Sequence, residues 1–356
     1  MRAPLSGPAF CGLLAAATTA LALTQIARNR TPDFAQDYAA AWAYWHGHPV
    51  HAPTGELLRR CWPDHGFSRL DGVQQPHPPF ATLLALPLAL LPFPTARLVW
   101  CCLSGAAIAA GWQSARASRS VCLASVPIWC VALVLGTHEP VLFALIAAAA
   151  LGLPARPRMA GLCLGLSIAL KAYPAVLLVG LVLTRNRRCL SAALCSAAAA
   201  AIAAELVLGW GTTVQWLAYT RVNTATYLHD SQNGSMVRHV HRLIPLPPAA
   251  IAAGLAVLLV APLARKLKAD DPLRPLLPVA LLASPLSWRH YMGLTSLLPL
   301  DIPERLCLVL AGGLTLLFGI GWIAAPPELF VQLPLVGLLL VQWARCSLAR
   351  PPAGDR

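Results

Sequence analysis

The chain alternates long apolar runs with short polar connections. No charged residue lies between Arg2 and Arg28, and an uncharged stretch of about 20 residues is long enough to span a bilayer. Further apolar runs lie at about 79–92, 94–113, 120–136, 140–153, 159–183, 189–209, 246–264, 273–288, 291–300, 306–324 and 328–344. This pattern predicts a single integral membrane domain over residues 1–356, an all-α polytopic bundle of about 10–12 transmembrane helices.

Two features of these runs leave alternatives open. Ala20-Leu21-Ala22 is similar to a signal-peptide cleavage site, but the long apolar stretch favours an uncleaved first helix. Several runs are short or contain proline, such as Pro87 and Pro299. Broken segments of this kind often line a cavity inside the membrane.

Charge along the chain predicts a topology. The short basic loops at 185–188 and 265–268 are expected in the cytoplasm by the positive-inside rule. Counting helices from them places the N-terminus inside, and the long polar segments 28–78 and 210–245 outside as two outer loops. Nine of the ten histidines then face outside, His138 being the exception. The same count places four arginines outside, against the rule: Arg116, Arg119, Arg156 and Arg158.

Composition narrows the class of protein. Charged residues make up 12% of the chain, about half of the 25% that is typical of soluble domains, which excludes a soluble globule. The net charge of +13 suits contacts with anionic lipid head groups or phosphate-bearing substrates, and we do not expect nucleic acid as a partner.

Segment 33–45 predicts an amphipathic interfacial helix in the first outer loop. Phe34, Tyr38, Trp42 and Trp45 fall on one face, where aromatic side chains are expected at the level of the lipid head groups. Asp33 is either an N-cap, with Gln36 as its partner, or a general base at the membrane surface.

Other polar residues also permit two interpretations. The segment His46–His51 has three histidines that could hold a metal, but its glycine and proline favour a turn. Lys171 lies inside an apolar run, so it is functional, or else it snorkels or pairs with Glu205. Arg238 and Arg242 are four residues apart after an Asn-Gly turn, and they form either a phosphate site or a solvated loop. Segment 284–291 is either a second cationic and aromatic cluster or an interface belt.

Taken in order, these segments resemble glycosyltransferase family 87, the polyprenyl-phosphate-mannose-type transferases of the GT-C superfamily. The resemblance covers most of the chain and rests on five short motifs: Asp33-Phe34 leading into Tyr38 and Gly47, His77-Pro-Pro-Phe80, Gly161 to Pro174 with Lys171, Gln232-Asn233-Gly-Ser235 with Arg242-Leu243, and Ser284-Pro285 with Trp288 and His290-Tyr291. The chain departs from the family where Gly136-Thr-His138-Glu139 replaces the frequent Gly-Gln-x-Asn, and where Gln-Asn-Gly-Ser replaces Asn-Gln-Ser.

The resemblance implies a GT-C fold and an inverting transfer of a hexose, mannose above all, without cofactor or metal. The donor would be a polyprenyl-phosphate sugar, and the acceptor a lipid-linked or cell-envelope glycan. Asp33 matches the position of the catalytic base, with Asp37 as second choice, and His290 would orient that base or bind phosphate. The implied substrate-binding residues are Lys171, Arg238, Arg242, Arg289, Asn233, His77 and Tyr38.

Other classes of membrane protein remain as alternatives. A transporter or flippase of lipid-linked glycans would show paired repeats and scattered polar residues, and a polymerase or ligase of the O-antigen type would need no acidic residue directly after the first helix. A non-catalytic subunit would leave Asp33 dispensable. The Ala-, Pro- and Arg-rich composition suggests a high-GC bacterium, hence an inner membrane with the site facing the periplasm.

Overall fold

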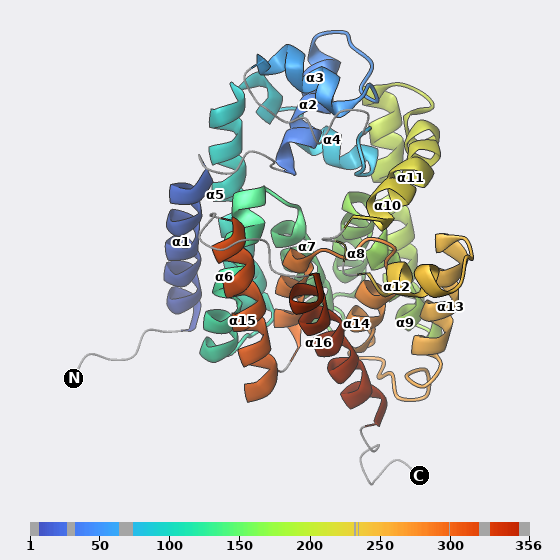
Figure 1. The fold of residues 1–356 in the computed structure, drawn as a ribbon. Helices are drawn as coiled ribbons and strands as arrows, with labels where there is room; N and C mark the ends of the chain where they lie inside the picture. Colours follow the sequence, from blue (N-terminus) through green and yellow to red (C-terminus); the bar gives the residue numbers. More distant parts are fainter. Residues whose placement is uncertain are drawn as a thin grey trace, which may run out of the picture.

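A computed structural model describes residues 7–26, 33–63, 74–230, 233, 235–298, 300–319 and 328–348. All regular elements in these ranges are helices (Figure 1), which confirms the all-α polytopic class. In chain order they are α1 (Gly7–Ile26), α2 (Phe34–Trp45), α3 (Thr54–Cys61), α4 (Pro79–Ala85), η3 (Leu88–Leu90), α5 (Phe93–Ser114), α6 (Arg119–Leu135), α7 (Glu139–Gly152), α8 (Pro157–Leu170), η4 (Tyr173–Leu177), α9 (Leu178–Leu183), α10 (Arg187–Leu208), α11 (Thr212–Leu228), α12 (Met236–Leu243), α13 (Pro248–Val260), η5 (Arg274–Leu276), α14 (Leu277–Leu282), η6 (Arg289–Leu297), α15 (Ile302–Gly319) and α16 (Glu328–Leu348).

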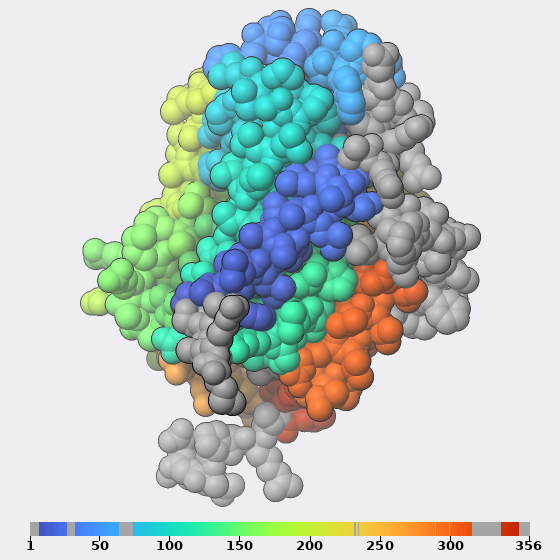
Figure 2. Space-filling model, turned by 90° about the vertical axis from the view of Figure 1, so that its left-hand side faces the viewer, coloured from blue at the N-terminus to red at the C-terminus, as the bar shows by residue number. Residues whose placement is uncertain are grey.

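The expected apolar runs coincide with helices, but few helices are long enough to cross a bilayer alone. Among the described residues, α1, α5 and α10 are long and apolar enough, and α12 and α13, bent by 115°, are either one broken span or a re-entrant loop. Figure 2 shows α1 lying obliquely across α5 on one side of the bundle. Several of the other apolar helices have 10–17 described residues, so the number of full crossings stays a prediction.

The run 159–183 is a hairpin and not one span. Helices α8 and α10 lie parallel and in close contact, because a Cβ added at Gly161 would lie 2.3 Å from the Cys189 carbonyl oxygen, and one at Gly165 would lie 2.3 Å from that of Ala193. Helix α8 ends at Leu170, Lys171 is extended with φ −148° and ψ 138°, and η4 and α9 lead back to the start of α10.

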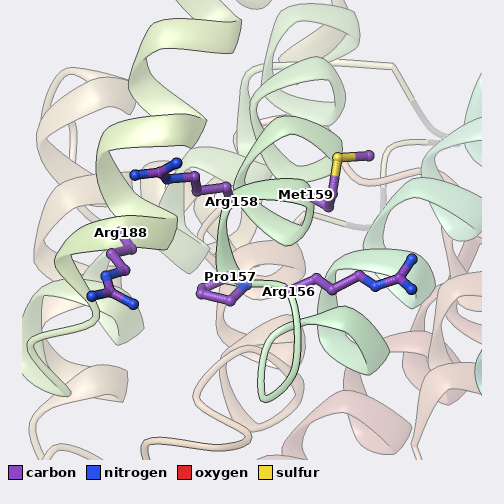
Figure 3. Close-up of a pocket in the computed structure, with 5 residues that line it drawn as sticks. All are labelled: Arg156, Pro157, Arg158, Met159 and Arg188. Atoms are coloured by element: carbon purple, nitrogen blue, oxygen red, sulfur yellow. The ribbon is translucent and has the colours of Figure 1, made fainter.

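This hairpin corrects the predicted topology. Arg156 and Arg158 lie at the start of α8 and line one shallow pocket together with Arg188 at the start of α10 (Figure 3). The prediction had placed the first two outside and the third inside, because it counted residues 159–183 as one crossing. Arg119 lies over the ring of Phe10, 5.4 Å from its centroid, so it too lies at the end where α1 begins. We call this end, with Arg119, Arg156, Arg158 and Arg188, the basic end.

The two segments expected as outer loops contain helices that pack on each other. In the first segment, α2 and α3 lie at the top of Figure 1. In the second, α11 occupies 17 residues that were expected as loop. Its Trp216 indole donates to the Pro76 carbonyl at 3.2 Å, and the Asn223 amide donates to the Gln74 carbonyl at 3.1 Å. The end of the bundle opposite the basic end is therefore covered by protein.

Helix α2 forms as predicted, but two residues of its aromatic face, Phe34 and Tyr38, lie against protein, whereas Trp45 is 48% exposed. Phe34 is 1% exposed, and its ring stacks on Trp100 of α5 at a centroid distance of 5.4 Å. Tyr38 is 3% exposed and packs edge-on against Phe93. Such pairs stabilise beyond their buried area, by about 0.5–1.5 kcal/mol each, so α5 competes successfully with lipid for these rings.

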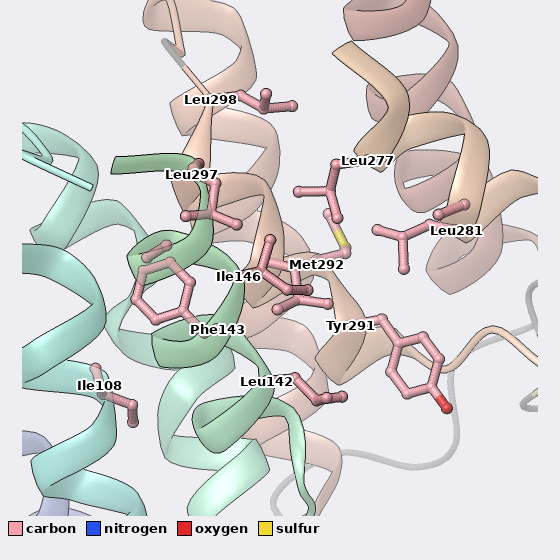
Figure 4. Close-up of a cluster of buried hydrophobic side chains, with 14 of the residues drawn as sticks. Ile108, Leu142, Phe143, Ile146, Leu277, Leu281, Tyr291, Met292, Leu297 and Leu298 are labelled. Atoms are coloured by element: carbon pink, nitrogen blue, oxygen red, sulfur yellow. The ribbon is translucent and has the colours of Figure 1, made fainter. Parts of the chain in front are cut away.

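Below α2, the apolar core joins α7, α14 and η6. Phe143, Ile146, Leu281 and Met292 are buried in one cluster (Figure 4). Tyr291 lies at its edge, and its hydroxyl points away from the apolar side chains. The polar site begins where this cluster ends.

Candidate active site

Asp37 is the carboxylate of α2. It is fully buried, and the Gln75 side-chain amide donates to its Oδ1 at 2.6 Å. His77 Nδ1 lies 3.1 Å from both Asp37 oxygens. His77 stands between Pro76 and Pro78, whose fixed φ angles stiffen the segment. The predicted substrate residue His77 therefore contacts the second-choice base.

His138 joins this pair from the start of α7. Its Nε2 lies 3.6 Å from Asp37 Oδ2, and its ring packs edge-on against His77. Gly136 adopts a left-handed φ of 72°, and its carbonyl accepts a hydrogen bond from the Trp100 indole at 2.9 Å, which fixes the approach to α7. The topology prediction was therefore wrong to separate His138 from the other histidines.

A second buried cluster surrounds Glu139, the next residue. Lys171 Nζ donates to Glu139 Oε1 at 2.7 Å and to the Tyr291 hydroxyl at 3.0 Å. His290 Nε2 lies 3.5 Å from Glu139 Oε2. The structure thus brings together the predicted residues Lys171 and His290, at the tips of two broken segments, around a carboxylate that sequence reasoning missed.

The expected pairing of Lys171 with Glu205 was wrong. Glu205 instead accepts hydrogen bonds from the backbone N–H groups of Gly211 and Thr213, both at 2.6 Å, and so holds the start of α11. The one sequence signal for the true partner was the departure at Gly136–Glu139, where the family pattern Gly-Gln-x-Asn gives way to His138 and Glu139.

Asp33 differs from Asp37 in both contacts and protonation. It stands at the N-cap position of α2, as one interpretation expected, but its side chain makes no capping hydrogen bond, and its backbone N–H donates to the Leu135 carbonyl at 2.7 Å. Burial raises the pKa of Asp33 from 3.8 to about 6, although the charges of Lys171 and His77 oppose the rise. Burial also acts on Asp37, but His77, His138 and the Gln75 hydrogen bond outweigh it and lower the pKa of that carboxyl.

Asn233 and Tyr38 are engaged within the protein. The Asn233 amide donates to the carbonyls of Pro285 and Tyr227, and its oxygen accepts from the N–H groups of Ser235 and Ser287. These four bonds use its whole hydrogen-bonding capacity, so Asn233 positions the segment before η6, and a contact with substrate stays a prediction. The Tyr38 hydroxyl donates to the Leu91 carbonyl at 2.8 Å.

The two predicted arginines of the second loop differ in exposure. Both lie on α12, where Arg238 is 1% exposed and donates to the Asn233 carbonyl at 3.0 Å, whereas Arg242 is exposed, so a shared phosphate site stays a prediction. The side chain of Arg289 lies outside the described residues.

The three histidines of the turn at 46–51 form no metal-ligand group in the described part of the chain. The rings of His46 and His48 stack on Trp42, with centroid distances of 4.0 and 5.7 Å, and His51 packs near Tyr219. The turn interpretation of this segment therefore describes it better than a metal cluster.

The fold and the site together define an integral membrane protein with a buried, charged site beneath one end of a helical bundle. The chain belongs to glycosyltransferase family 87, whose family model matches residues 76–286, more than half of its length. It is therefore a membrane glycosyltransferase. The matched segment contains His77, His138, Glu139 and Lys171. Comparison with curated proteins and with solved structures finds no match.

The Glu139–Lys171 pair yields a stability prediction. Removing one partner leaves the other charge buried, so Lys171→Met or Glu139→Gln should each cost about 3–5 kcal/mol, whereas the double variant should recover most of that loss. Thermal unfolding of each variant in detergent measures their order of stability.

The control is Glu56→Gln, which breaks an exposed pair with Arg60 at 2.9 Å and should cost less than about 1 kcal/mol. A double variant that is as unstable as the sum of the two single variants would contradict the buried pair.

Proposed function

We propose that this enzyme transfers a hexose, mannose first among the candidates, from a polyprenyl-phosphate donor to a lipid-linked or cell-envelope glycan, with inversion. The acceptor hydroxyl oxygen forms a bond to the anomeric carbon while the bond from that carbon to the phosphate oxygen breaks. The proton passes to Asp33, and polyprenyl phosphate leaves. Membership of the family supports the transfer of a sugar, while donor, acceptor and mechanism are the proposal.

The observation that carries the proposal is the contrast between the two carboxylates of the first loop. A general base works best when its pKa lies near the working pH, and burial raises the pKa of Asp33 to about 6. Asp37 is held by hydrogen bonds at both oxygens and is kept ionised. We therefore assign Asp33 as the base and Asp37 as an anchoring charge.

A positive charge near Asp33 would supply what a leaving phosphate needs. The charge of the Lys171 ammonium group opposes the rise in the pKa of Asp33, which supports a role for Lys171 beside that carboxylate. A fixed cation stabilises the negative charge that develops on the leaving oxygen. His290 lies 3.5 Å from Glu139, so its proposed role is to fix that carboxylate and, through it, the ammonium group of Lys171.

Asp33→Asn tests the base. A positioned base contributes about 10²–10⁴-fold to a rate, so transfer of labelled mannose from polyprenyl-phosphate mannose should fall by about that factor at an equal level of protein. The matched control is Asp270→Asn, a carboxylate on the exposed segment after α13, which should transfer at the wild-type rate.

Sugar transfer that continues at the wild-type rate in Asp33→Asn would refute the role of Asp33 as the general base. Absence of transfer by the wild type from every polyprenyl-phosphate sugar would refute the donor.

We also propose that the protein lies in the bacterial plasma membrane with the basic end in the cytoplasm and the site facing outward. The gathering of Arg119, Arg156, Arg158 and Arg188 at one end supports this orientation through the positive-inside rule.

Labelling of introduced cysteines tests the orientation. In a background in which the eleven native cysteines are replaced, His46→Cys should react with an impermeant maleimide in intact spheroplasts. Ala155→Cys, beside the basic pocket, should react only after the membrane is opened. The reverse pattern would overturn the orientation.

A further inference from the structure

We propose that Asp37, His77 and His138 bind one divalent transition-metal ion of the Zn²⁺ type. In the part of the chain that the structure describes, these three residues form the one group of at least three potential metal-ligating side chains whose ligand atoms converge. The three come from separate elements: helix α2, the segment before α4, and the start of α7.

The distances fit a coordination shell. One ligand atom from each residue lies within 4.8 Å of the other two. His77 Nδ1 lies 3.1 Å and His138 Nε2 3.6 Å from Asp37 Oδ2. Zinc–ligand bonds of about 2.0–2.2 Å in a tetrahedron place neighbouring ligand atoms about 3.3–3.6 Å apart, so the two printed distances to Asp37 Oδ2 lie within a few tenths of an ångström of that geometry.

His138 gives the strongest indication. A separation of 3.6 Å is too long for a hydrogen bond to Asp37. Its Nδ1 is also buried, with no hydrogen-bond partner in the described residues, although the side chain as a whole is 2% exposed. A metal ion between Nε2 and Oδ2 explains why an imidazole stands at this distance from a buried carboxylate.

The surroundings orient the carboxylate for this role. The Gln75 amide donates to Asp37 Oδ1 at 2.6 Å and to the Thr82 hydroxyl oxygen at 3.3 Å. Oδ1 is thereby fixed by an outer residue, and Oδ2 remains the oxygen that faces both imidazoles. Partners of this kind orient metal ligands and tune affinity by about 10–100-fold.

The ligand set selects the type of ion. Two imidazoles and one carboxylate suit Zn²⁺ and its transition-metal neighbours, whereas Mg²⁺ and Ca²⁺ prefer oxygen alone. Three protein ligands leave one coordination position for an oxygen atom of water, hydroxyl or phosphate. That this oxygen belongs to a sugar substrate rests on the proposed function, whereas the binding of the ion does not.

The test is metal binding by the full chain, purified in detergent with a histidine-free tag and stripped with a chelator. Titration with Zn²⁺ alone should give one ion per chain, and bound zinc should raise the temperature of unfolding. Asp37→Asn and His138→Gln should each weaken binding by about 100-fold or more, and Gln75→Ala by about 10–100-fold.

The matched control is His46→Gln, because that imidazole stacks on Trp42 away from the cluster. It should bind Zn²⁺ with wild-type stoichiometry and show the same thermal shift. Gln75→Ala leaves all three ligands in place, so it tests the site even if a ligand variant fails to fold.

Two results would overturn the proposal: wild-type protein that takes up no stoichiometric zinc, or binding that is equal in wild type, His138→Gln and Asp37→Asn. Either would leave the cluster as a hydrogen-bonded Asp–His pair only. Because no sugar is present, a failure of the transfer mechanism does not affect this measurement, and intact zinc binding without transfer would refute the proposed function alone.

Discussion

A charge buried in a membrane bundle must have a partner, and the ion pair between Glu139 and Lys171 meets this constraint. Lys171 Nζ lies 2.7 Å from Glu139 Oε1, and both side chains are buried. Glu139 stands in the first turn of α7, where a helix favours negative charge, and Lys171 stands where α8 stops and the backbone is extended. The pair therefore joins the end of one helix to the break in another, and Tyr291 and His290 of η6 complete it.

The surroundings of Asp33 and Asp37 shift the pKa values of the two carboxyl groups in opposite directions. Asp37 is held by His77 and Gln75, which favour its charged form, whereas Asp33 is half-buried and desolvation outweighs the charges around it. Separation of this kind is how proteins obtain different acid–base roles from the same residue type. The difference arises because Asp37 has two imidazoles and the Gln75 amide beside it, whereas burial outweighs the charges that act on Asp33.

Local patterns predicted much of this molecule. Apolar runs located the helices, and the spacing of Phe34, Tyr38 and Trp42 predicted α2 within a residue. The pattern could not show that residues 159–183 turn back at Lys171, because an extended break of one residue leaves hydrophobicity unchanged. Nor could it pair Lys171 with Glu139, 32 residues earlier, and with Tyr291, 120 residues later.

In the proposed mechanism Asp33 acts as a base whose pKa is raised by burial. The most direct measurement is the dependence of kcat/KM for sugar transfer on pH. We predict a rate that falls tenfold per pH unit below about 6, where Asp33 becomes protonated, with a midpoint that barely moves with temperature, as for a carboxylic acid. A midpoint near 4, the ordinary value for aspartate, or one that shifts with temperature as an imidazole does, would contradict the account.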